Sequence, residues 1–501
     1  MEKVEVLLIN PFLTVQADDP SGISPPLSLA YLAAYLRKRK VKVAILDISA
    51  KGVNQIKKIG NKVRIGLNDK QIVKKIKKYN PRVVGITCTS TLHASEALKT
   101  ASLVKKANPK ILVAMGGIHP TVEPEKVLKN SQVDLTVRGE GEITFWQIIK
   151  KFKNAKVPQN ILGTSYKQGK NIINNPLRPF IKNLNSLPFP TRDLLPMDIY
   201  FKESLKHKNY TIGKRVMSVI TSRGCPGNCS YCSIKTIWGR VWRARSAENV
   251  VDEIASLIKN YKCDEIHFMD DSISVNKKRL LEICNEIIKR RLKIKWTTPN
   301  GIAIWLLDKR LLVKMKKAGC YRLTFGLESG NKDVLNNYIG KYYNYNKAKE
   351  MISFASEIGL WTAATFIIGF PYETKKQIEE TINFAISTDL NMAVFYIANP
   401  FPGTKMYEDF LKENLLPRNK VIIRGCKTKH FSHQELTNIQ AKAFNQFMKS
   451  RFKRPLLYLN KVKSLGDLLY IFKLGKNLME IFINQNLSNK IKKSGIAALW
   501  K

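Results

Sequence analysis

Residues 221–232 read Thr-Ser-Arg-Gly-Cys-Pro-Gly-Asn-Cys-Ser-Tyr-Cys and hold three of the eight cysteines of the chain. Cys225, Cys229 and Cys232 follow a C-x3-C-x2-C spacing on a segment whose Gly and Pro residues predict a loop. Thiolates are soft ligands that suit iron, and three of them on one loop can converge on a [4Fe–4S] cluster. The fourth iron then has no cysteine ligand and is open to an external chelating molecule.

Zinc is the alternative metal for clustered cysteines. A structural zinc site takes four ligands, and the next cysteine downstream, Cys263, falls on a predicted helix-to-strand loop. Iron–sulfur ligation is therefore the favoured interpretation. The other cysteines lie apart, so no disulfide framework is expected and most are predicted to be small buried hydrophobes: Cys88, Cys263, Cys284, Cys320 and Cys426.

The cysteine loop follows the first of six short apolar runs, which alternate with amphipathic stretches over residues 211–410. This alternation predicts a (βα)6 partial TIM barrel with its active site at the carboxyl ends of the strands. The predicted strands are 217–220, 265–269, 294–297, 321–325, 362–367 and 392–397. The predicted helices lie near 247–260, 277–291, 308–318, 331–337, 346–358 and 374–388.

Residues 1–153 show the same alternation and predict an α/β domain with a doubly wound, Rossmann-like parallel sheet. Such sheets bind ligands beyond the carboxyl ends of their strands, where small and polar residues gather in this sequence. The predicted strands are 4–9, 42–46, 83–87, 111–115 and 134–137. The predicted helices lie near 27–39, 69–79, 92–107 and 142–153.

Two regions lack this alternation. Residues 154–210 are rich in Asn, Pro and Gly and are predicted to be a linker, whereas residues 411–501 are predicted to be helical and basic. An apolar stripe in the basic region predicts a helix that either rests on an anionic membrane or, as we favour, packs against the barrel. The stripe consists of Leu465, Leu468, Leu469, Phe472, Met479 and Phe482, with Lys461, Lys463, Lys473 and Lys476 around it.

The composition is that of a folded globular chain: 501 residues, 44% hydrophobic, with 85 Lys+Arg against 39 Asp+Glu and a net charge of +46. That charge favours anionic partners such as RNA, acidic lipids or phosphorylated substrates, but the even scatter of lysine favours a general compositional bias. No apolar run approaches the roughly 20 residues of a membrane span, and residues 1–11 lack the pattern of a secretory signal. We therefore predict a cytoplasmic protein, with peripheral membrane contact as an extension of that prediction.

The cysteine loop, with the aromatic Tyr231 before its last cysteine, resembles that of the radical S-adenosylmethionine (SAM) superfamily. Further segments match that superfamily in order and spacing, and together they are very specific. They are Phe268-Met269-Asp270-Asp271, Thr298-Pro299-Asn300-Gly301, Phe325-Gly326-Leu327-Glu328-Ser329-Gly330, Ile368-Gly369-Phe370-Pro371-Tyr372-Glu373-Thr374 and Asn399-Pro400-Phe401-Pro402-Gly403-Thr404.

The N-terminal unit resembles the cobalamin-binding domain of one radical SAM class, which includes the anaerobic magnesium-protoporphyrin ester cyclase and the hopanoid methylases. The matching phrases are Pro25–Leu32, Gly116–Thr121 and Arg138–Glu142. In the D-x-H-x-x-G motif of many cobalamin proteins a histidine ligates cobalt, whereas Asp47–Gly52 has Ser49 at that position. The resemblance therefore implies cobalamin without a histidine on cobalt. Serine offers no nitrogen ligand, and His119 is the candidate that could replace the histidine, but we expect it to serve the loop or to contact the corrin.

The resemblance also implies which residues contact the cofactors. SAM contacts are expected from Asp270, Asp271, Asn300, Glu328 and Ser329, besides Tyr231. The alternatives are that an aspartate caps the following helix and that Glu328 pairs with a lysine. Residues 367–371 are expected to pack against adenine. Cobalamin contacts are expected from Ser49, Gly116, Gly117, His119, Thr121, Glu140, Gly141 and Glu142.

Three arginines follow the cysteine loop: Arg240, Arg243 and Arg245. Their guanidinium groups are suited to bind a carboxylate of SAM or a phosphate of substrate or cobalamin. A solvated basic loop explains the same pattern equally well, so both interpretations stay open at this point.

The resemblance implies an enzyme that uses a [4Fe–4S] cluster, SAM and cobalamin to generate a 5′-deoxyadenosyl radical. It would methylate, or otherwise remodel, an unactivated carbon of a lipid, tetrapyrrole or other small metabolite, with ferredoxin or flavodoxin as electron donor. One alternative is an RNA-modifying enzyme of the methylthiotransferase type, but only Cys88 precedes residue 225 as a ligand for a second cluster, so a nucleic-acid partner is not expected. The other alternative is a non-catalytic cobalamin sensor.

Overall fold

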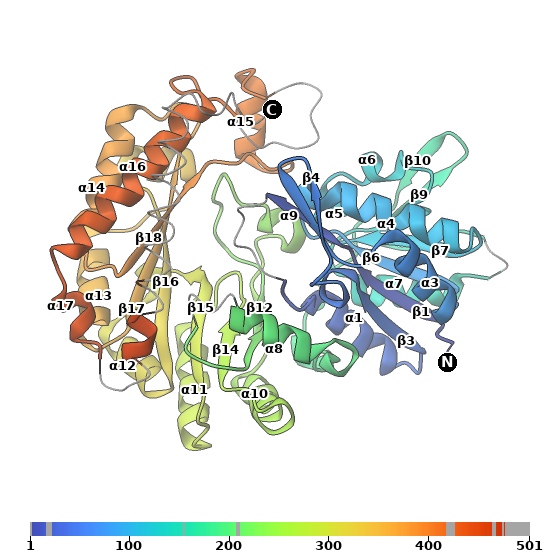
Figure 1. Ribbon diagram of the computed structural model, residues 1–501, viewed down its shortest axis with the longest axis horizontal. Helices are drawn as coiled ribbons and strands as arrows, with labels where there is room; N and C mark the ends of the chain where they lie inside the picture. The colour runs from blue at the N-terminus through green and yellow to red at the C-terminus, as the bar shows by residue number, and fades with distance from the viewer. Residues whose placement is uncertain are drawn as a thin grey trace.

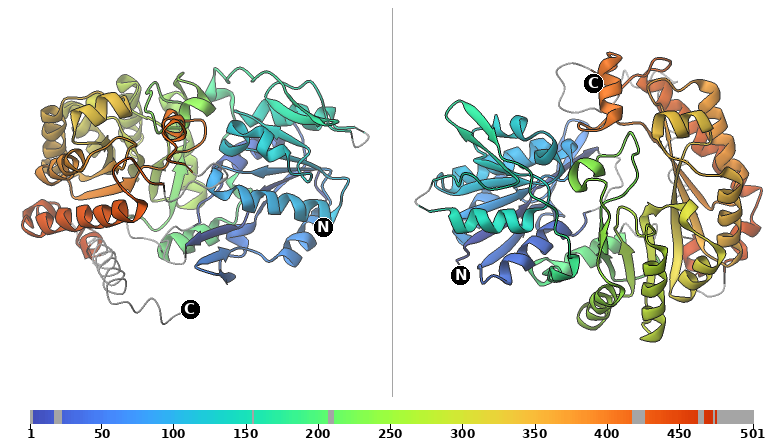
Figure 2. Two further views of the ribbon diagram at one scale, coloured as in Figure 1. Left: turned by 90° about the horizontal axis from the view of Figure 1, so that it is seen from above. Right: turned by 180° about the vertical axis from the view of Figure 1, so that it is seen from behind.

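The computed structural model describes residues 3–16, 23–153, 156–206, 211–416, 426–462, 467–472 and 475. Two lobes lie side by side: an N-terminal lobe built on a seven-stranded sheet and a barrel built on a six-stranded sheet (Figure 1). The segment from β12 (Ser222–Arg223) to α9 (Ile234–Trp238) lies between the two sheets, also when the molecule is seen from behind (Figure 2). The cysteine loop is part of this segment.

The predicted doubly wound sheet of the N-terminal lobe is confirmed. Its strand order is β10-β9-β8-β7-β6-β1-β3, and the five strands from β8 to β3 run parallel. The chain reverses its direction of winding between β1 and β6, which is where ligands bind in sheets of this kind. The parallel strands are β1 (Val6–Asn10), β3 (Val43–Asp47), β6 (Val83–Thr87), β7 (Leu112–Gly116) and β8 (Leu135–Val137).

Helices cover both faces of this sheet, which explains why its central strands are apolar throughout. Val6, Leu7, Leu8 and Ile9 of β1, for example, are all fully buried, with alternate residues packing into two separate hydrophobic clusters. The helices are α1 (Leu27–Arg37), α2 (Ile48–Lys51), α3 (Asp69–Tyr79), α4 (Ala94–Ala107), α5 (Ile118–Val122), α6 (Pro124–Leu128) and α7 (Gly141–Lys151), with the 3-10 turn η1 (Thr91–His93).

A small antiparallel sheet was not predicted from the sequence. It pairs β2 (Leu13–Gln16) with β5 (Lys62–Ile65), and β5 with β4 (Ile56–Ile59). All four residues of β4 are exposed. The apolar periodicity that reveals buried strands is therefore absent from this segment, which explains why the sequence did not show it.

Residues 154–210, predicted to be a linker, contain more structure than expected. The hairpin of β9 (Thr164–Gln168) and β10 (Asn171–Asn174) extends the first sheet, with β9 antiparallel to β8. Two 3-10 turns, η2 (Leu184–Ser186) and η3 (Arg192–Leu194), and helix α8 (Met197–Lys206) follow. Tyr200 of α8 is buried, and its hydroxyl donates a hydrogen bond to the Asp47 carboxylate of the N-terminal lobe. The segment is therefore packed against that lobe, although its polar composition predicted an exposed linker.

The partial barrel is confirmed as an open sheet of six parallel strands in chain order. The strands are β11 (Val216–Val219), β14 (Glu265–Phe268), β15 (Lys295–Ile302), β16 (Cys320–Glu328), β17 (Trp361–Ile368) and β18 (Met392–Ile397). The helices on its outer side are α10 (Ala247–Tyr261), α11 (Lys277–Lys289), α12 (Lys309–Lys317), α13 (Tyr345–Glu357) and α14 (Lys375–Ser387). Shorter pieces are β13 (Arg243–Ala244), η5 (Ile304–Leu306) and the π-helix η6 (Val334–Ile339), which takes the place of the helix predicted near 331–337.

The described residues after 410 are mainly helical, with α16 (His433–Phe452) and α17 (Leu456–Leu459) after α15 (Lys405–Lys412), whereas residues 413–416 and 426–432 form turns and coil. Helix α16 covers β18, where the Gln440 side chain donates to the Phe395 carbonyl at 2.6 Å. Of the predicted apolar stripe, Leu468, Leu469 and Phe472 are exposed, whereas residues 463, 465, 473, 476, 479 and 482 lie outside the described residues. Within the described part of the chain, no helix is both long and apolar enough to cross a bilayer.

Candidate active site between the two lobes

A cavity of about 330 Å³ lies between the lobes at the carboxyl end of the first sheet. The N-terminal lobe contributes the ends of β6, β7 and β8 and the start of α1 and α7, and the barrel contributes residues next to the cysteine loop. Its walls combine glycines and apolar side chains with a few charged groups: Tyr31, Thr87, Thr89, Gly116, Gly117, Gly139, Glu140, Gly141, Glu142, Phe145, Ile220, Arg223, Trp238, Met269 and Asp271. The cavity therefore borders the predicted cobalamin wall and, on the barrel side, reaches the predicted SAM contacts only through Asp271.

The cysteine loop brings its thiols together around Gly227. A Cβ added to Gly227 would lie 3.3 Å from the Cys225 sulfur and 3.9 Å from the Cys229 sulfur. All three cysteines are free and partly exposed, and burial raises the pKa of each thiol, that of Cys232 to about 11. Loading a cluster must remove these protons, because only the thiolate is a metal ligand.

Among the described residues no group of three or more His, Cys, Asp and Glu side chains is placed to hold a single metal ion. A zinc ion would need its ligands to converge at about 2.0–2.3 Å from one point. The three cysteines lie on one loop, and among the described residues no fourth His, Cys, Asp or Glu side chain is grouped with them. Three thiols without a fourth ligand fit a [4Fe–4S] cluster better than a zinc ion. Their assignment as iron ligands stays a prediction.

The loop backbone is bonded to two other parts of the barrel. The Ser230 amide donates to the Ile339 carbonyl at 2.9 Å, and the Met406 amide donates to the Ser230 carbonyl, also at 2.9 Å. These two bonds attach the loop to η6 and to the start of α15. The three cysteines therefore lie on a loop that is bonded to the barrel at Ser230, while residues 226–228 between the first two cysteines are exposed.

Beside the thiols lies an ion pair of the barrel. The Glu328 carboxylate accepts from the Tyr231 hydroxyl at 2.8 Å and from the Lys341 ammonium, also at 2.8 Å. Burial alone would lower the pKa of Lys341, but the nearby Glu328 and Cys229 raise it, so this lysine stays charged. Glu328 adopts a φ of +67°, a strained value for a residue with a side chain, which is a pattern found at functional sites.

The two aspartates after β14 both contact the start of the cysteine segment. Asp270 is 2% exposed, and its Oδ1 accepts from the Thr221 amide and hydroxyl and from the Ser222 hydroxyl at 2.6–2.9 Å. Asp271 lines the cavity and accepts from the Gly224 amide at 2.9 Å. Burial raises the pKa of Asp271 to about 6. Asp270 thus supports the loop, whereas Asp271 reaches the cavity.

The other two predicted SAM contacts lie at neighbouring strand ends. Asn300 is exposed at the end of β15 and donates to the Met269 carbonyl at 3.0 Å. Ser329 is fully buried, and its hydroxyl lies 3.0 Å from that of Thr381. Residues 367–371 were predicted to pack against adenine. Ile368, Phe370 and Pro371 are buried, so Ile367 is the one partly exposed apolar side chain of this segment.

The glycines predicted to contact cobalamin line the cavity. A Cβ added to Gly116 or Gly141 would meet only Val137, at 3.6 and 3.9 Å, so glycine at these positions leaves open space in the cavity. At Gly117, with φ of +113°, an added Cβ would lie 2.6 Å from the Cys88 carbonyl oxygen, so only glycine fits there. Thr121 accepts from the Gly139 amide at 3.0 Å and supports the neighbouring loop. This wall suits a large flat group.

The carboxylates of Glu140 and Glu142 are engaged in ion pairs. Arg223 reaches Glu140 at 2.8 Å and Glu142 at 2.6 Å, and Arg243 reaches Glu140 at 2.8 Å. Burial would raise the pKa of Glu142, but the charge of Arg223 lowers it below its ordinary value. Both glutamates border the cavity, as expected for cobalamin contacts. Their negative charges, however, are already neutralised by Arg223 and Arg243.

Neither Ser49, at the motif position of the cobalt-ligating histidine, nor His119 borders the cavity. The Ser49 hydroxyl is 1% exposed and donates to Asp47 Oδ1 at 2.7 Å. His119 is 2% exposed, with Nδ1 3.2 Å from the Thr91 hydroxyl and 3.6 Å from Glu123. Burial lowers the pKa of His119. The structure therefore agrees with a loop-supporting role for this histidine.

Two of the three arginines after the loop form buried interactions, contrary to a solvated basic loop. Arg243 pairs with Glu140, and Arg245 pairs with Glu253 and donates to the Ile220 carbonyl at 3.0 Å. Arg240 is exposed and lies within 3.3–3.4 Å of the Pro226 carbonyl of the cysteine loop.

Sequence reasoning missed two residues of this region, Arg223 and Lys341. Arg223 stands inside the decisive segment but was not singled out, and its partners, 81 and 83 residues earlier, are known only from the fold. Lys341 is one of 85 basic residues, so its type carried no signal. The one sequence feature that could have marked it is its position directly after Gly340, 13 residues beyond Glu328.

Comparison with known proteins agrees with this geometry. Residues 14–149 match the B12 binding domain and residues 219–385 the radical SAM superfamily. The chain is 35% identical to an uncharacterized methyltransferase of Pyrococcus horikoshii, over 89% of this chain and 93% of that protein. It is 29% identical to the anaerobic magnesium-protoporphyrin IX monomethyl ester cyclase of Rubrivivax gelatinosus, over 81% of this chain and 70% of that one.

The fold is similar to that of the cobalamin-dependent S-adenosylmethionine radical enzyme OxsB, solved with aqua-cobalamin and SAM bound. That match has a TM-score of 0.70 at 18% identity and covers 99% of this chain and 76% of that one. The two family matches, the relative that is similar over 93% of its length and the similar fold all indicate the same family. The chain belongs to the cobalamin-binding radical SAM enzymes, whose cofactors are a [4Fe–4S] cluster, SAM and cobalamin.

Proposed function

We propose that this enzyme transfers a methyl group to an unactivated carbon of a small metabolite. The observation that carries the proposal is the single cavity bordered both by the glycine-rich strand ends of the N-terminal lobe and by residues adjoining the cysteine loop. Similarity to a methyltransferase over most of both chains favours methylation, and similarity to a cyclase leaves ring formation as the second candidate. Bound together, the cofactors supply one-electron cleavage of SAM and a transferable methyl group.

The residues of the barrel would bind the cluster and SAM, and those of the N-terminal lobe would bind cobalamin. Cys225, Cys229 and Cys232 would hold the cluster. Lys341 would offer its ammonium to the carboxylate of SAM, while Glu328 would accept hydrogen bonds from polar groups of SAM. Asp271 would hold the Gly224 amide and present its second oxygen to the cavity.

On the other side, Gly116, Gly117 and Gly141 would let the corrin approach the backbone closely. Phe145 and Ile237 are buried apolar side chains that line the cavity, and with the cofactors bound they would help to exclude water and so strengthen the polar contacts inside it. Neither Ser49 nor His119 is assigned as a ligand of cobalt.

The proposal is tested with anaerobically purified protein supplied with iron, sulfide and cobalamin. With SAM carrying a deuterated methyl group, a reductant and a small-molecule extract of cells lacking the gene as the source of methyl acceptor, we expect 5′-deoxyadenosine and S-adenosylhomocysteine to form repeatedly. Mass spectrometry of small metabolites from cells with and without the gene should then show a product that is 3 Da heavier with labelled than with unlabelled methyl donor. Formation of 5′-deoxyadenosine alone would favour the cyclase candidate, and no SAM cleavage with an intact cluster would contradict both.

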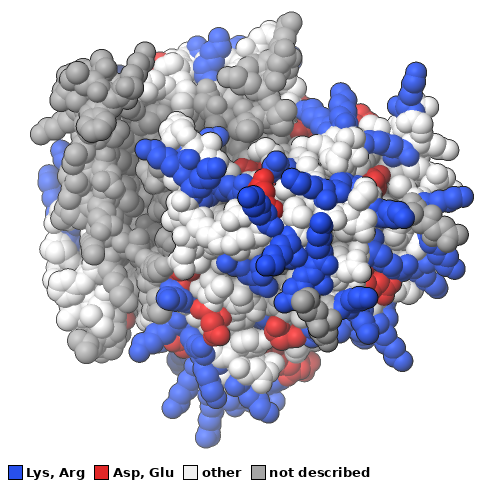
Figure 3. Space-filling view, turned by 45° about the vertical axis from the view of Figure 1, so that its right-hand side comes forward, with Lys and Arg blue, Asp and Glu red and all other residues white. Residues whose placement is uncertain are grey.

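The electron donor is proposed to be an acidic ferredoxin or flavodoxin. The net charge of +46 and the basic side chains spread over the face of Figure 3 favour association with an acidic protein. We expect reduced flavodoxin to support SAM cleavage at a rate that falls steeply as salt is raised, whereas the rate with dithionite falls less. Equal salt dependence of the two rates would contradict this partner.

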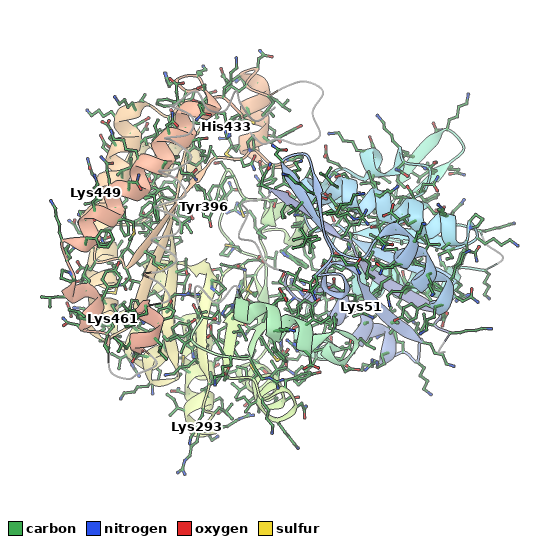
Figure 4. The ribbon with its side chains drawn as sticks, viewed as in Figure 1. Lys51, Lys293, Tyr396, His433, Lys449 and Lys461 are labelled. Atoms are coloured by element: carbon green, nitrogen blue, oxygen red, sulfur yellow. The ribbon has the colours of Figure 1, made fainter. Side chains whose placement is uncertain are left out.

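Peripheral membrane contact is proposed for the C-terminal region. Phe452, Leu456 and Leu459 are 57–65% exposed, and Phe472 is 68% exposed, among basic residues. Lys449 is exposed on the side of the barrel turned away from the N-terminal lobe (Figure 4). Lys461 lies on the same side but is 4% exposed and donates to the Leu360 carbonyl, so it does not contribute to this surface. We expect the protein to float with vesicles containing phosphatidylglycerol but not with pure phosphatidylcholine, and Leu456→Glu to abolish flotation while Ile56→Glu, at an exposed apolar residue of the N-terminal lobe, does not.

A further inference from the structure

Four buried charges join the two lobes next to the cavity. Arg223 contacts Glu140 and Glu142, and Arg243 contacts Glu140, at 2.6–2.8 Å. The four residues are only 5–8% exposed. We call these contacts the interlobe ion pairs. Two positive charges face two negative charges, so the group is balanced without any ligand.

Both arginines belong to one short ribbon. Arg223 of β12 pairs directly with Arg243 of β13 in an antiparallel arrangement, and Arg223 is followed at once by Gly224 and Cys225. Both glutamates belong to the loop after β8 and the first turn of α7, where Gly139 and Gly141 line the cavity. The interlobe ion pairs therefore join the start of the cysteine loop to the wall predicted to hold cobalamin.

The rest of the cysteine loop is attached to the barrel. Ser230 exchanges backbone hydrogen bonds with Ile339 and Met406, and Tyr231 donates to Glu328. The loop is thus bonded to the barrel on its far side, and Arg223 bonds its start to the N-terminal lobe. Helix α9, directly after the loop, also contacts α5 of that lobe. The Arg223 guanidinium also lies over the rings of Tyr31 and Trp238, at 5.6 and 5.3 Å from their centroids, which further defines its orientation.

Buried ion pairs contribute little net stability compared with apolar packing, but their charge-assisted bonds fix geometry. Chemistry shared between two cofactors is sensitive to geometry, since a misplacement of about 1 Å can cost about 100-fold in rate. We propose that Arg223, with Glu142, Glu140 and Arg243, sets the separation between the cluster loop and the cobalamin wall. These are positioning residues, and the inference rests on the two cofactor sites proposed above.

The test measures that separation directly. In protein loaded with both cofactors and reduced to cob(II)alamin and the paramagnetic cluster, EPR reports the spin–spin coupling between them. For Arg223→Lys, which keeps the charge but loses the two-pronged contact, we expect unchanged iron and cobalamin content. The coupling should be altered, corresponding to a displacement on the order of 1 Å or a broader distribution.

Arg192→Lys is the matched control. Arg192 forms an equally buried ion pair with Glu253, at 2.7 Å, but it does not border the cavity. We expect its coupling to equal that of the unmodified protein. Glu142→Gln is a milder second variant, because glutamine can still accept from Arg223, and it should give an intermediate change.

An unchanged coupling in folded Arg223→Lys and Glu142→Gln would overturn the inference. Loss of cobalamin from Glu142→Gln with the cluster intact would overturn it too, since the glutamate would then be a cofactor ligand. Failure of the unmodified protein to bind both cofactors would instead contradict the proposed sites themselves.

Discussion

The ammonium of Lys341 lies 2.8 Å from Glu328 Oε1 and also donates to the Gly326 carbonyl at 3.0 Å. The pair stands beside Cys229, whose thiol interacts with both charges. A fixed cation and a fixed anion thus adjoin the candidate cluster site. A zwitterion such as the methionine part of SAM carries the complementary charges.

Lys341→Met should weaken SAM binding while leaving the cluster in place. Removing a charged hydrogen-bond donor costs about 1.5–3 kcal/mol, which corresponds to roughly 10- to 100-fold in the dissociation constant. Equilibrium dialysis with labelled SAM measures this constant, and iron content checks the cluster. Lys347→Met, at an exposed lysine of α13, is the control and should bind SAM normally. Unchanged affinity in the Lys341 variant would refute the assignment.

Replacing any one of Cys225, Cys229 and Cys232 by alanine should abolish the iron–sulfur absorption and EPR signals, together with SAM cleavage. With only three protein ligands, the cluster has no replacement thiolate nearby. Cys88→Ala is the control, because Cys88 is buried in the N-terminal lobe, and it should retain iron. A full iron complement in Cys229→Ala would rule out the proposed ligand set.

The cobalt environment should be insensitive to His119. Because His119 is buried against Thr91 and Glu123 and does not line the cavity, His119→Ala and Ser49→Ala should leave the EPR spectrum of bound cob(II)alamin unchanged. A nitrogen hyperfine pattern that disappears in His119→Ala would show that the histidine moves onto cobalt. Cobalamin content, measured by absorption, separates ligation from simple loss of binding.

Stability should fall with rising pH because of Glu373. This fully buried carboxyl accepts from the Gly369 and Phe370 amides, and burial raises its pKa to about 8. The folded state keeps a proton that the unfolded state releases above about pH 4.5. The free energy of unfolding should therefore decrease between about pH 4.5 and about pH 8.

Glu373→Gln removes this titration and keeps an oxygen for the two amides. Thermal unfolding at pH 5 and pH 8.5 should show a smaller loss of stability in the variant than in the unmodified protein, by at least about 1 kcal/mol. Equal pH dependence of the two proteins would mean that Glu373 is ionised throughout.

The sequence alone determined the two sheets and the cysteine loop. Buried parallel strands must be apolar along their whole length, so runs such as 83–87 and 362–367 were recognisable without any partner. The C-x3-C-x2-C spacing was equally local, because a loop of this length forces its thiols to be neighbours.

Only the tertiary structure decided what the charged and exposed residues do. Glu140 and Glu142 were expected to contact cobalamin, and their arginine partners, 81–103 residues away, became visible only once the lobes were packed together. The exposed strand β4 and the hairpin β9–β10 likewise depend on pairing with distant segments, as does the place of Lys341 beside Cys229. Apolar burial leaves a periodic trace in the chain, whereas an ion pair between distant residues leaves none.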